Sequence, residues 1–364
     1  MKSMFKRLFL PGLVFQSVCI GGGYGTGREL AEFFLQYGPI GGLLGLLLPA
    51  TIVISVGCAI GYELARVTRS YDYRKFLKLL MGRGWVLYEV AYGASVLLVL
   101  AVVSSAIGTL ASENFGAPNM LGSATLLLAI AFLVFKGTNL IEDVMSAWSF
   151  VLYAVYVSIF VASMLAFGDK LGEVFASTQV TDGWFLSGIR YGSLQLALVP
   201  AILFATAHIE TRRDAITAGL LTGPLFLIPA TLFFIAMVPH YPAIMERPVP
   251  VNFILELLGH KWLQIAFVLM LVGTFIETGS GMIHAINERI AGALEVTGKT
   301  LSGKNRALIA IGVLLLALLL SRFGIIDLIA MGYGALTWIF MMILILPLFT
   351  VGLWNVLRPS KGDS

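Results

Sequence analysis

The stretch Cys19-Ile20-Gly21-Gly22-Gly23-Tyr24-Gly25-Thr26-Gly27-Arg28-Glu29-Leu30 lies inside the first long apolar segment of the chain, residues 8–37. Five of these twelve residues are glycine. One glycine costs a helix interior about 1 kcal/mol relative to alanine, and a cluster multiplies that cost. In a lipid bilayer an open backbone is tolerated only where protein buries it or where it lines a watery cavity. The stretch therefore predicts a transmembrane helix that is broken at residues 21–27.

Two other interpretations of the glycines compete with a broken helix. Glycines four residues apart can let two membrane helices pack closely, and that alternative stays open. A dinucleotide-binding loop needs the pattern Gly-x-Gly-x-x-Gly between a strand and a helix of a soluble domain. Gly21, Gly23 and Gly25 do not complete this spacing, and no strand precedes them. The sequence therefore disfavours nucleotide binding.

The composition places the chain in a membrane. Its 364 residues are 58% hydrophobic and only 12% charged, with a mean hydropathy of +0.91, whereas a soluble domain carries about 25% charged residues. We expect an all-helical polytopic protein forming one transmembrane domain over residues 1–364, with the lipid bilayer as a partner and no nucleic acid. The net charge of +4 reflects loops, and two cysteines exclude a disulfide framework or a multi-cysteine metal site.

A spanning helix needs about 20 mainly apolar residues, and the sequence offers ten such segments. Most of the 24 lysines and arginines fall on the side of the bilayer that would hold both termini. This bias predicts cytoplasmic N- and C-termini and a location in the plasma membrane, the inner membrane of a bacterium. The segments are 8–37, 40–67, 85–113, 120–135, 140–167, 189–208, 216–238, 262–290, 307–320 and 325–357.

The sixth segment carries a second interruption. Pro200 lacks a backbone N–H and clashes with the carbonyl of Leu196. Interrupted helices at corresponding positions of two halves mark the binding site in secondary transporters. We therefore predict two inverted repeats of five helices, about 8–168 and 189–357, with the first and sixth helices broken. A plain proline kink remains the alternative.

The sequence Gly-Gly-Gly-Tyr-Gly-Thr-Gly-Arg-Glu-Leu-Ala-Glu-Phe-Phe at 21–34, followed by Tyr37-Gly38-Pro39, resembles the first helix of the YkvI-like membrane proteins. Their pattern is similar to Gly-Ala-Gly-Phe-Ala-Ser-Gly-Gln-Glu followed by a phenylalanine pair. Those proteins look like members of the amino acid–polyamine–organocation superfamily, which implies a LeuT-like fold and transport. The resemblance covers the topology of the whole chain but the motif of the first helix alone. Arg28 stands where the pattern has glutamine, so no substrate transfers with it.

The expected solute site draws on the first, third and sixth helices. The half-helix after Gly27 would present backbone amides that favour a carboxylate, and the carbonyls before it would favour a cation. A hydroxyl such as that of Ser104 can instead bond back to its own helix. The candidate solute contacts are Gly21, Gly22, Gly23, Tyr24, Gly25, Thr26, Gly27, Ser104, Gln195, Ala197, Val199, Pro200 and Phe204.

Glu277 in the eighth segment is the sharpest candidate for ion coupling. An ionisable group inside the membrane costs at least about 3 kcal/mol and usually faces a cavity or a partner. Glu277 could load and release a proton, or it could belong to a structural hydrogen-bond network. The resemblance to LeuT-like carriers implies a Na⁺ site at Thr278 and Ser280 with carbonyls of the first helix. The ion-coupling candidates are Cys19, Gly22, Glu277, Thr278 and Ser280.

Two further features concern access to the site. In LeuT-like carriers an arginine just past the break meets an aspartate of the tenth helix, which implies a gate between Arg28 and Asp327. Glu29 or Glu32 could neutralise Arg28 instead. Glu277, Gly281, His284 and Glu288 share one helical stripe and could form a polar path.

Together these features predict a secondary active transporter that moves a small organic solute by alternating access. The solute would be an amino acid or a related zwitterion or amine, coupled to Na⁺ or H⁺, with no other cofactor. The alternative is a membrane receptor or sensor subunit that binds such a solute without moving it. The chain has no His-Glu-x-x-His, Walker or Gly-x-Ser-x-Gly motif to indicate an enzyme. The oligomeric state stays open, with a monomer among the options.

Overall fold

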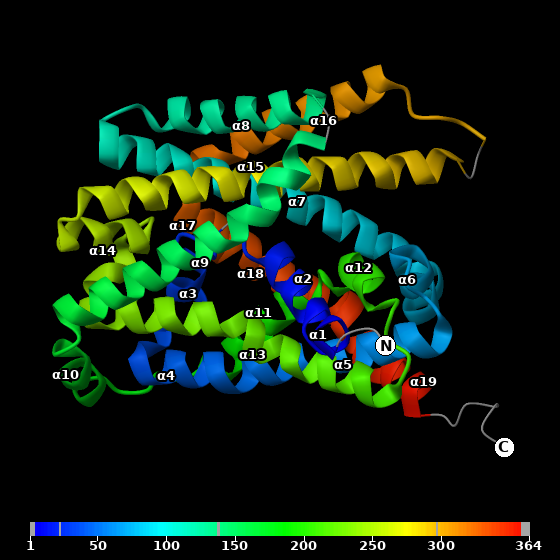
Figure 1. Ribbon diagram of the computed structural model, residues 1–364, viewed down its shortest axis with the longest axis horizontal. Coiled ribbons are helices and arrows are strands. Elements are labelled where there is room, and N and C mark those ends of the chain that lie inside the picture. Colours follow the sequence, from blue (N-terminus) through cyan, green and yellow to red (C-terminus); the bar gives the residue numbers. More distant parts are fainter. Residues whose placement is uncertain (1–3, 22, 137–138, 296–297, 358–364) are drawn as a thin grey trace.

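The computed structural model describes residues 4–21, 23–136, 139–295 and 298–357, with the backbone alone for 139–150. Throughout that part the chain forms helices and no strands (Figure 1). Its main helices are α1 (Met4–Leu8), α2 (Leu10–Cys19), α3 (Arg28–Phe33), α4 (Gly38–Gly45), α5 (Thr51–Thr68), α6 (Tyr73–Met81), α7 (Trp85–Phe115), α8 (Asn119–Lys136), α9 (Asn139–Phe167), α10 (Lys170–Ser177), α11 (Trp184–Leu196), α12 (Val199–Ile202), α13 (Arg212–Met237), α14 (Pro250–Leu258), α15 (Lys261–Glu295), α16 (Gly303–Leu320), α17 (Ile325–Asp327), α18 (Gly334–Phe340) and α19 (Leu353–Leu357).

The expectation of a polytopic helical membrane protein is confirmed. Each of the ten predicted segments contains helix, and seven helical stretches of the described chain are long and apolar enough to span a bilayer. A bent pair, Val151–Phe167 with Lys170–Ser177, raises that number to eight, while α2 and Asn119–Phe135 are shorter. Large apolar side chains such as Leu128, Leu165 and Leu308 are exposed on the outside, where lipid would cover them. The count of ten, the inverted repeat and the sidedness of the termini stay predictions.

The helices form two groups with the interrupted segments between them. In Figure 1, α7, α8, α15 and α16 lie together, and α5 and α13 lie together on the other side. In the same view the short helices α2, α3 and α18 lie between the two groups. The described residues around the first break, 19–21 and 23–31, are buried in protein, as a bilayer requires of open backbone.

The first helix is broken where the glycines predict it. Helix α2 ends at Cys19, α3 begins at Arg28, and the described residues between them form turns and bends. Gly27 precedes α3 with a φ of 81°, a left-handed conformation that glycine adopts without steric strain. Gly22 lies outside the described residues.

The second interruption is also present. Helix α11 ends at Leu196, and α12 starts at Val199 with Pro200 in its first turn. Proline is well suited to this position because its missing N–H would have no partner there. A 3₁₀ segment, Leu203–Thr206, follows. Pro200 therefore begins a new short helix instead of kinking a continuous one.

Glycines also mediate close helix packing away from the break, in α13. A Cβ atom on Gly219 would overlap the backbone of Ala59 and lie 2.8 Å from the carbonyl carbon of Cys58. One on Gly223, four residues on, would lie 2.7 Å from the carbonyl oxygen of Thr51. The two backbones of α5 and α13 thus approach directly, as small residues at this spacing permit in membranes.

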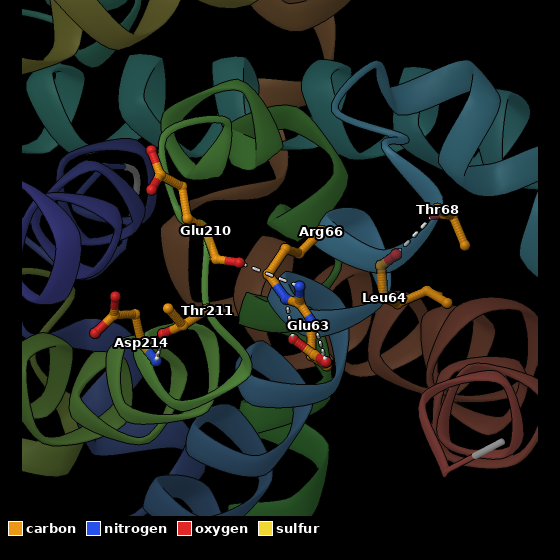
Figure 2. A network of polar contacts seen from close by, with 7 residues as sticks. All are labelled: Glu63, Leu64, Arg66, Thr68, Glu210, Thr211 and Asp214. Atoms are coloured by element: carbon orange, nitrogen blue, oxygen red, sulfur yellow. Dashed lines mark hydrogen bonds and ion pairs between the residues drawn. The ribbon is translucent and has the colours of Figure 1, made fainter. Parts of the chain in front are cut away.

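A polar network fixes the chain between α12 and α13 (Figure 2). Arg66 at the end of α5 donates two bonds of 2.7 Å to the Glu63 carboxylate and one of 3.2 Å to the carbonyl of Glu210. The Thr211 hydroxyl accepts the amide of Asp214 at 3.1 Å and so caps α13. Asp214 in turn pairs with Arg7 at 3.0 Å. The network ties α1, α5 and α13 together at one end of the bundle.

Replacing Gly219 with alanine should destabilise the protein, because the new methyl group has no room against α5. We expect a loss of about 1–3 kcal/mol, the range typical of overpacking, seen as a lower melting temperature of the detergent-solubilised protein. Gly312→Ala in α16 is the matched control, since nothing lies within 4 Å of its Cβ position. It should keep or slightly raise the melting temperature. Equal effects of the two substitutions would contradict the close α5–α13 packing.

Candidate functional site

A cavity of about 60 Å³ lies where the break in the first helix meets four other elements. A buried water needs roughly 10–15 Å³ by this measure, so the cavity has room for about four waters or one small solute. Its walls come from both sides of the break, from α7, α11 and α15, and from the segment around α18. The lining residues are Val18, Cys19, Gly21, Glu29, Tyr92, Ser95, Val96, Val99, Leu194, Gln195, Ala197, Leu198, Thr278, Met282, Tyr333, Leu336 and Phe340.

Glu29 is the acidic residue of this cavity. It lies in the first turn of α3 and is only 3% exposed. The backbone amides of Gly23 and Tyr24 face its carboxyl group, and the Tyr191 hydroxyl lies nearby without completing a hydrogen bond. Its Oε2 atom is buried with no hydrogen-bond partner. Among the ion pairs of the described chain, none involves Glu29.

Glycine is needed at two points of the break because other groups approach the backbone closely. A Cβ on Gly23 would overlap the Ile329 side chain and lie 2.9 Å from Cγ of Glu29. One on Gly21 would lie 3.0 Å from Cγ2 of Thr278. The glycines therefore let Glu29 and Thr278 reach the unwound backbone.

The structure brings part of the predicted solute site to the cavity. Gly21, Gln195 and Ala197 line it, as does Cys19, which the sequence predicted at the ion site. The other described residues of the break make structural contacts with the surrounding helices or with the break itself. Tyr24 donates to the carbonyl of Phe226 at 3.3 Å. Thr26 donates to the carbonyl of Gly23 at 2.8 Å and accepts the amide of Arg28 at 3.2 Å. Gly25 packs near Leu271, and Gly27 near Val251.

Four predicted solute contacts lie elsewhere. Ser104 packs against Ser123 of α8, whose hydroxyl donates to the Ser104 carbonyl at 2.8 Å. Ser104 lies five residues beyond Val99, the last lining residue of α7, or about 8 Å along the helix. Val199 and Pro200 are buried in α12, beyond the lining part of α11, and Phe204 is 65% exposed. These four residues do not line the cavity in this structure, and their role as solute contacts stays a prediction.

The predicted ion-coupling residues are separated. Thr278 lines the cavity beside Gly21. The Ser280 hydroxyl instead donates to the carbonyl of Ile276 in its own helix at 2.7 Å. Glu277 is not among the lining residues, and Gly281 and His284 on its stripe are exposed. Glu288 is exposed as well, whereas Glu277 itself is half-buried.

Arg28 does not pair with Asp327 in this structure. Its guanidinium bonds Glu32 at 2.9 Å and the carbonyls of Met245 and Arg247 at 2.6 and 3.3 Å, whereas Asp327 is exposed. Glu32 lies one turn along the same helix, so it reaches Arg28 at little cost. Of the partners that the sequence left open for Arg28, Glu32 is the one observed.

Besides Arg28, Arg289 in the C-terminal part of α15 also makes several contacts. Arg289 bonds Glu89 of α7 at 2.8 and 2.9 Å. Its guanidinium carbon lies 3.8 Å from the ring centre of Tyr92 and 4.1 Å from that of Tyr73. Tyr92 lines the cavity and also a larger hollow of about 520 Å³ beside Arg289.

Sequence reasoning missed the cavity roles of Glu29, Tyr92 and Tyr333. Glu29 directly follows the glycine cluster and Arg28, and it was considered only as a counter-charge for that arginine. Its position next to the break was a usable signal. Tyr92 and Tyr333 gave none, because an aromatic residue in an apolar helix is ordinarily part of the core.

Gly23→Ala should lower the stability of the break. The added methyl group must displace Ile329 or the Glu29 side chain, at a cost of about 1–3 kcal/mol. Gly281→Ala, with open space around its Cβ position, is the control, and both can be compared by thermal unfolding. A Gly23→Ala protein as stable as the control would show that the break is looser than described.

Comparison with known proteins agrees with this geometry. No family model matches the chain. The uncharacterized membrane protein YkvI of Bacillus subtilis (strain 168) is 23% identical over 290 residues, which cover 79% of this chain and 82% of YkvI.

Two solved structures have a similar fold over nearly the whole chain. The crystal structure of MhsT in complex with L-phenylalanine superposes with a TM-score of 0.59 at 15% identity, covering 98% of this chain and 97% of MhsT. The substrate-bound, outward-open state of a Na⁺-coupled sialic acid symporter gives a TM-score of 0.55 at 13% identity, covering 96% and 84%. The chain therefore resembles YkvI in sequence and is a helical membrane protein with the LeuT-like fold.

Proposed function

We propose that this protein is a secondary active transporter that moves a small organic solute across the plasma membrane by alternating access. The observation that carries the proposal is the cavity at the break of the first helix, bounded on another side by the end of α11 before the second break. Solute and ion sites of secondary transporters are built from such discontinuous helices. The MhsT structure contains an amino acid, which supports an amino acid or a related small solute here.

The arrangement of charges supports two separate closures. The contacts of Arg28 hold α3 against residues 245–247, which precede α14 and therefore lie near the start of α15. Arg289 lies seven residues past the lining residue Met282, about 10 Å further toward the other end of α15. Figure 1 shows α14 and α6 near opposite ends of α15. A carrier needs such a pair of closures so that one can open while the other stays shut.

Thr278 supports sodium as the coupling ion. Its side chain faces the cavity next to Gly21, just past the end of α2. The hydroxyls of Thr274 and Ser280 in the same helix donate to carbonyls one turn back. No such bond is found for Thr278 within the described residues, so its hydroxyl is available as an oxygen ligand.

Counterflow in proteoliposomes tests transport directly. Vesicles containing the purified protein are loaded with an unlabelled amino acid and diluted into a trace of the labelled one. A carrier exchanges the two and accumulates label transiently, whereas a receptor or sensor binds label in proportion to the amount of protein and exchanges none. We expect exchange above that of protein-free vesicles. Binding of an amino acid without any exchange would favour the sensor and overturn the proposal.

Thr278→Val removes one hydroxyl with little change in shape. We expect it to raise the sodium concentration for half-maximal uptake by about 10-fold, the size of one lost hydrogen bond or ligand to a charged group. Thr125→Val in α8 is the control, because that hydroxyl is exposed and donates to its own helix at 2.8 Å. Uptake that does not depend on sodium in the unmodified protein would contradict this assignment.

A further inference from the structure

We propose that Glu29 binds the positively charged ammonium group of the solute, so that the cavity accepts amines and amino acids and rejects plain carboxylates. This inference rests on the proposed function and assigns a substrate class to the same cavity. Three observations support it: the charged side chains of the cavity wall, the surroundings of Glu29, and the backbone amides of Gly23 and Tyr24 that face its carboxyl group.

The wall of the cavity is negative at one point and has no positive side chain. Glu29 is its carboxylate, and none of the lining residues found in the described chain is a lysine, arginine or histidine. Most of the remaining wall is apolar, formed by side chains such as Val96, Leu194 and Met282. Glu29 is therefore the acidic group of this wall that a positively charged part of a solute would meet.

Glu29 has hydrogen-bond donors in the amides of Gly23 and Tyr24 but no positively charged partner among the described residues. Its neighbour Arg28 is directed to Glu32 and two carbonyls on the far side of α3. The Oε2 atom of Glu29 and the hydroxyl of Tyr191 are both buried without a hydrogen bond. Burying a charge is expensive unless it is paired and hydrogen-bonded. A bound ammonium group supplies both the opposite charge and three donors.

The backbone amides at the break are already turned toward a negative group. The sequence assigned these donors to the carboxylate of a solute, but those of Gly23 and Tyr24 face the carboxyl of Glu29. The protein's own side chain therefore takes the place predicted for the solute's negative end. What this corner of the cavity lacks is a cation.

Aromatic rings beside Glu29 suit the same ligand. Tyr333 and Phe340 line the cavity, and ring faces attract organic cations within about 6 Å. The ring of Tyr92 is already used by Arg289. The Phe340 ring packs against Tyr88, with 6.0 Å between the ring centres. An acidic group with the Tyr333 ring in the same wall favours an organic ammonium over a bare metal ion, which needs several oxygen ligands.

The test compares solutes that share a carbon skeleton and differ in charge. Alanine, ethylamine and propionate match the small cavity, and the same triad can be built for leucine with 3-methylbutylamine and 4-methylpentanoate. The twenty common amino acids complete the panel. Binding is measured as the rise in melting temperature of the full-length protein in detergent, which scales with occupancy, in sodium and at several pH values.

We expect ammonium-bearing members of the panel to stabilise the unmodified protein and the carboxylates to have no effect. Glu29→Gln should weaken binding of those ligands at least about 10-fold, since losing one partner of a buried charge pair typically costs 2–5 kcal/mol. Glu173→Gln, at an exposed position in α10, is the matched control and should bind as the unmodified protein does. If the Glu29→Gln protein does not fold, the panel measured on the unmodified protein still tests whether amines bind and carboxylates do not.

Three results would overturn the assignment. The first is a carboxylate that binds as well as its amine. The second is a panel in which no ammonium-bearing solute binds. The third is a folded Glu29→Gln protein that keeps its affinity for amines and loses only the pH or sodium dependence, which would make Glu29 the site of the coupling ion. Counterflow separates this failure from failure of the transport proposal, because exchange can persist when ammonium selectivity does not.

Discussion

The structure depends on one constraint: backbone groups inside a bilayer must find partners within the protein. The glycines at 21–27 end α2 and free backbone groups deep in the apolar part of the chain. The fold meets the constraint by placing this segment between its two helix groups (Figure 1). Glu29, Thr26 and the amide of Val251 then occupy many of the freed groups. The opening that remains is the cavity.

The sequence predicted those features that arise from local chemistry. Clustered glycines and Pro200 act on the backbone where they stand, so both interruptions were found at the right residues. Apolar segments long enough for a bilayer correspond directly to helices. The neutralisation of Arg28 by Glu32 follows from helical spacing. Each of these inferences needs only a few neighbouring residues.

Features that depend on how distant helices are placed were not predictable in this way. The pairing of Arg28 with Asp327 and the depth of Ser104 both required the vertical offset between helices. The ion pair between Glu89 and Arg289 joins residues 200 positions apart, and neither sequence environment identifies the other. The stripe that begins at the half-buried Glu277 becomes exposed at Gly281 and His284. Rotation about a helix axis is set by packing, which a single sequence does not reveal.

Tyr92 is the residue shared by the linings of the central cavity and the 520 Å³ hollow. Its ring packs against the guanidinium of Arg289, whose carbon lies 3.8 Å from the ring centre. Rotation of an unclamped ring takes nanoseconds, whereas separating packed helices takes microseconds to milliseconds. Toward the other end, the contacts of Arg28 with residues 245–247 join whole segments. The two ends of the cavity therefore differ: one is bordered by an aromatic ring held by a guanidinium, and the other by contacts between an arginine and backbone carbonyls.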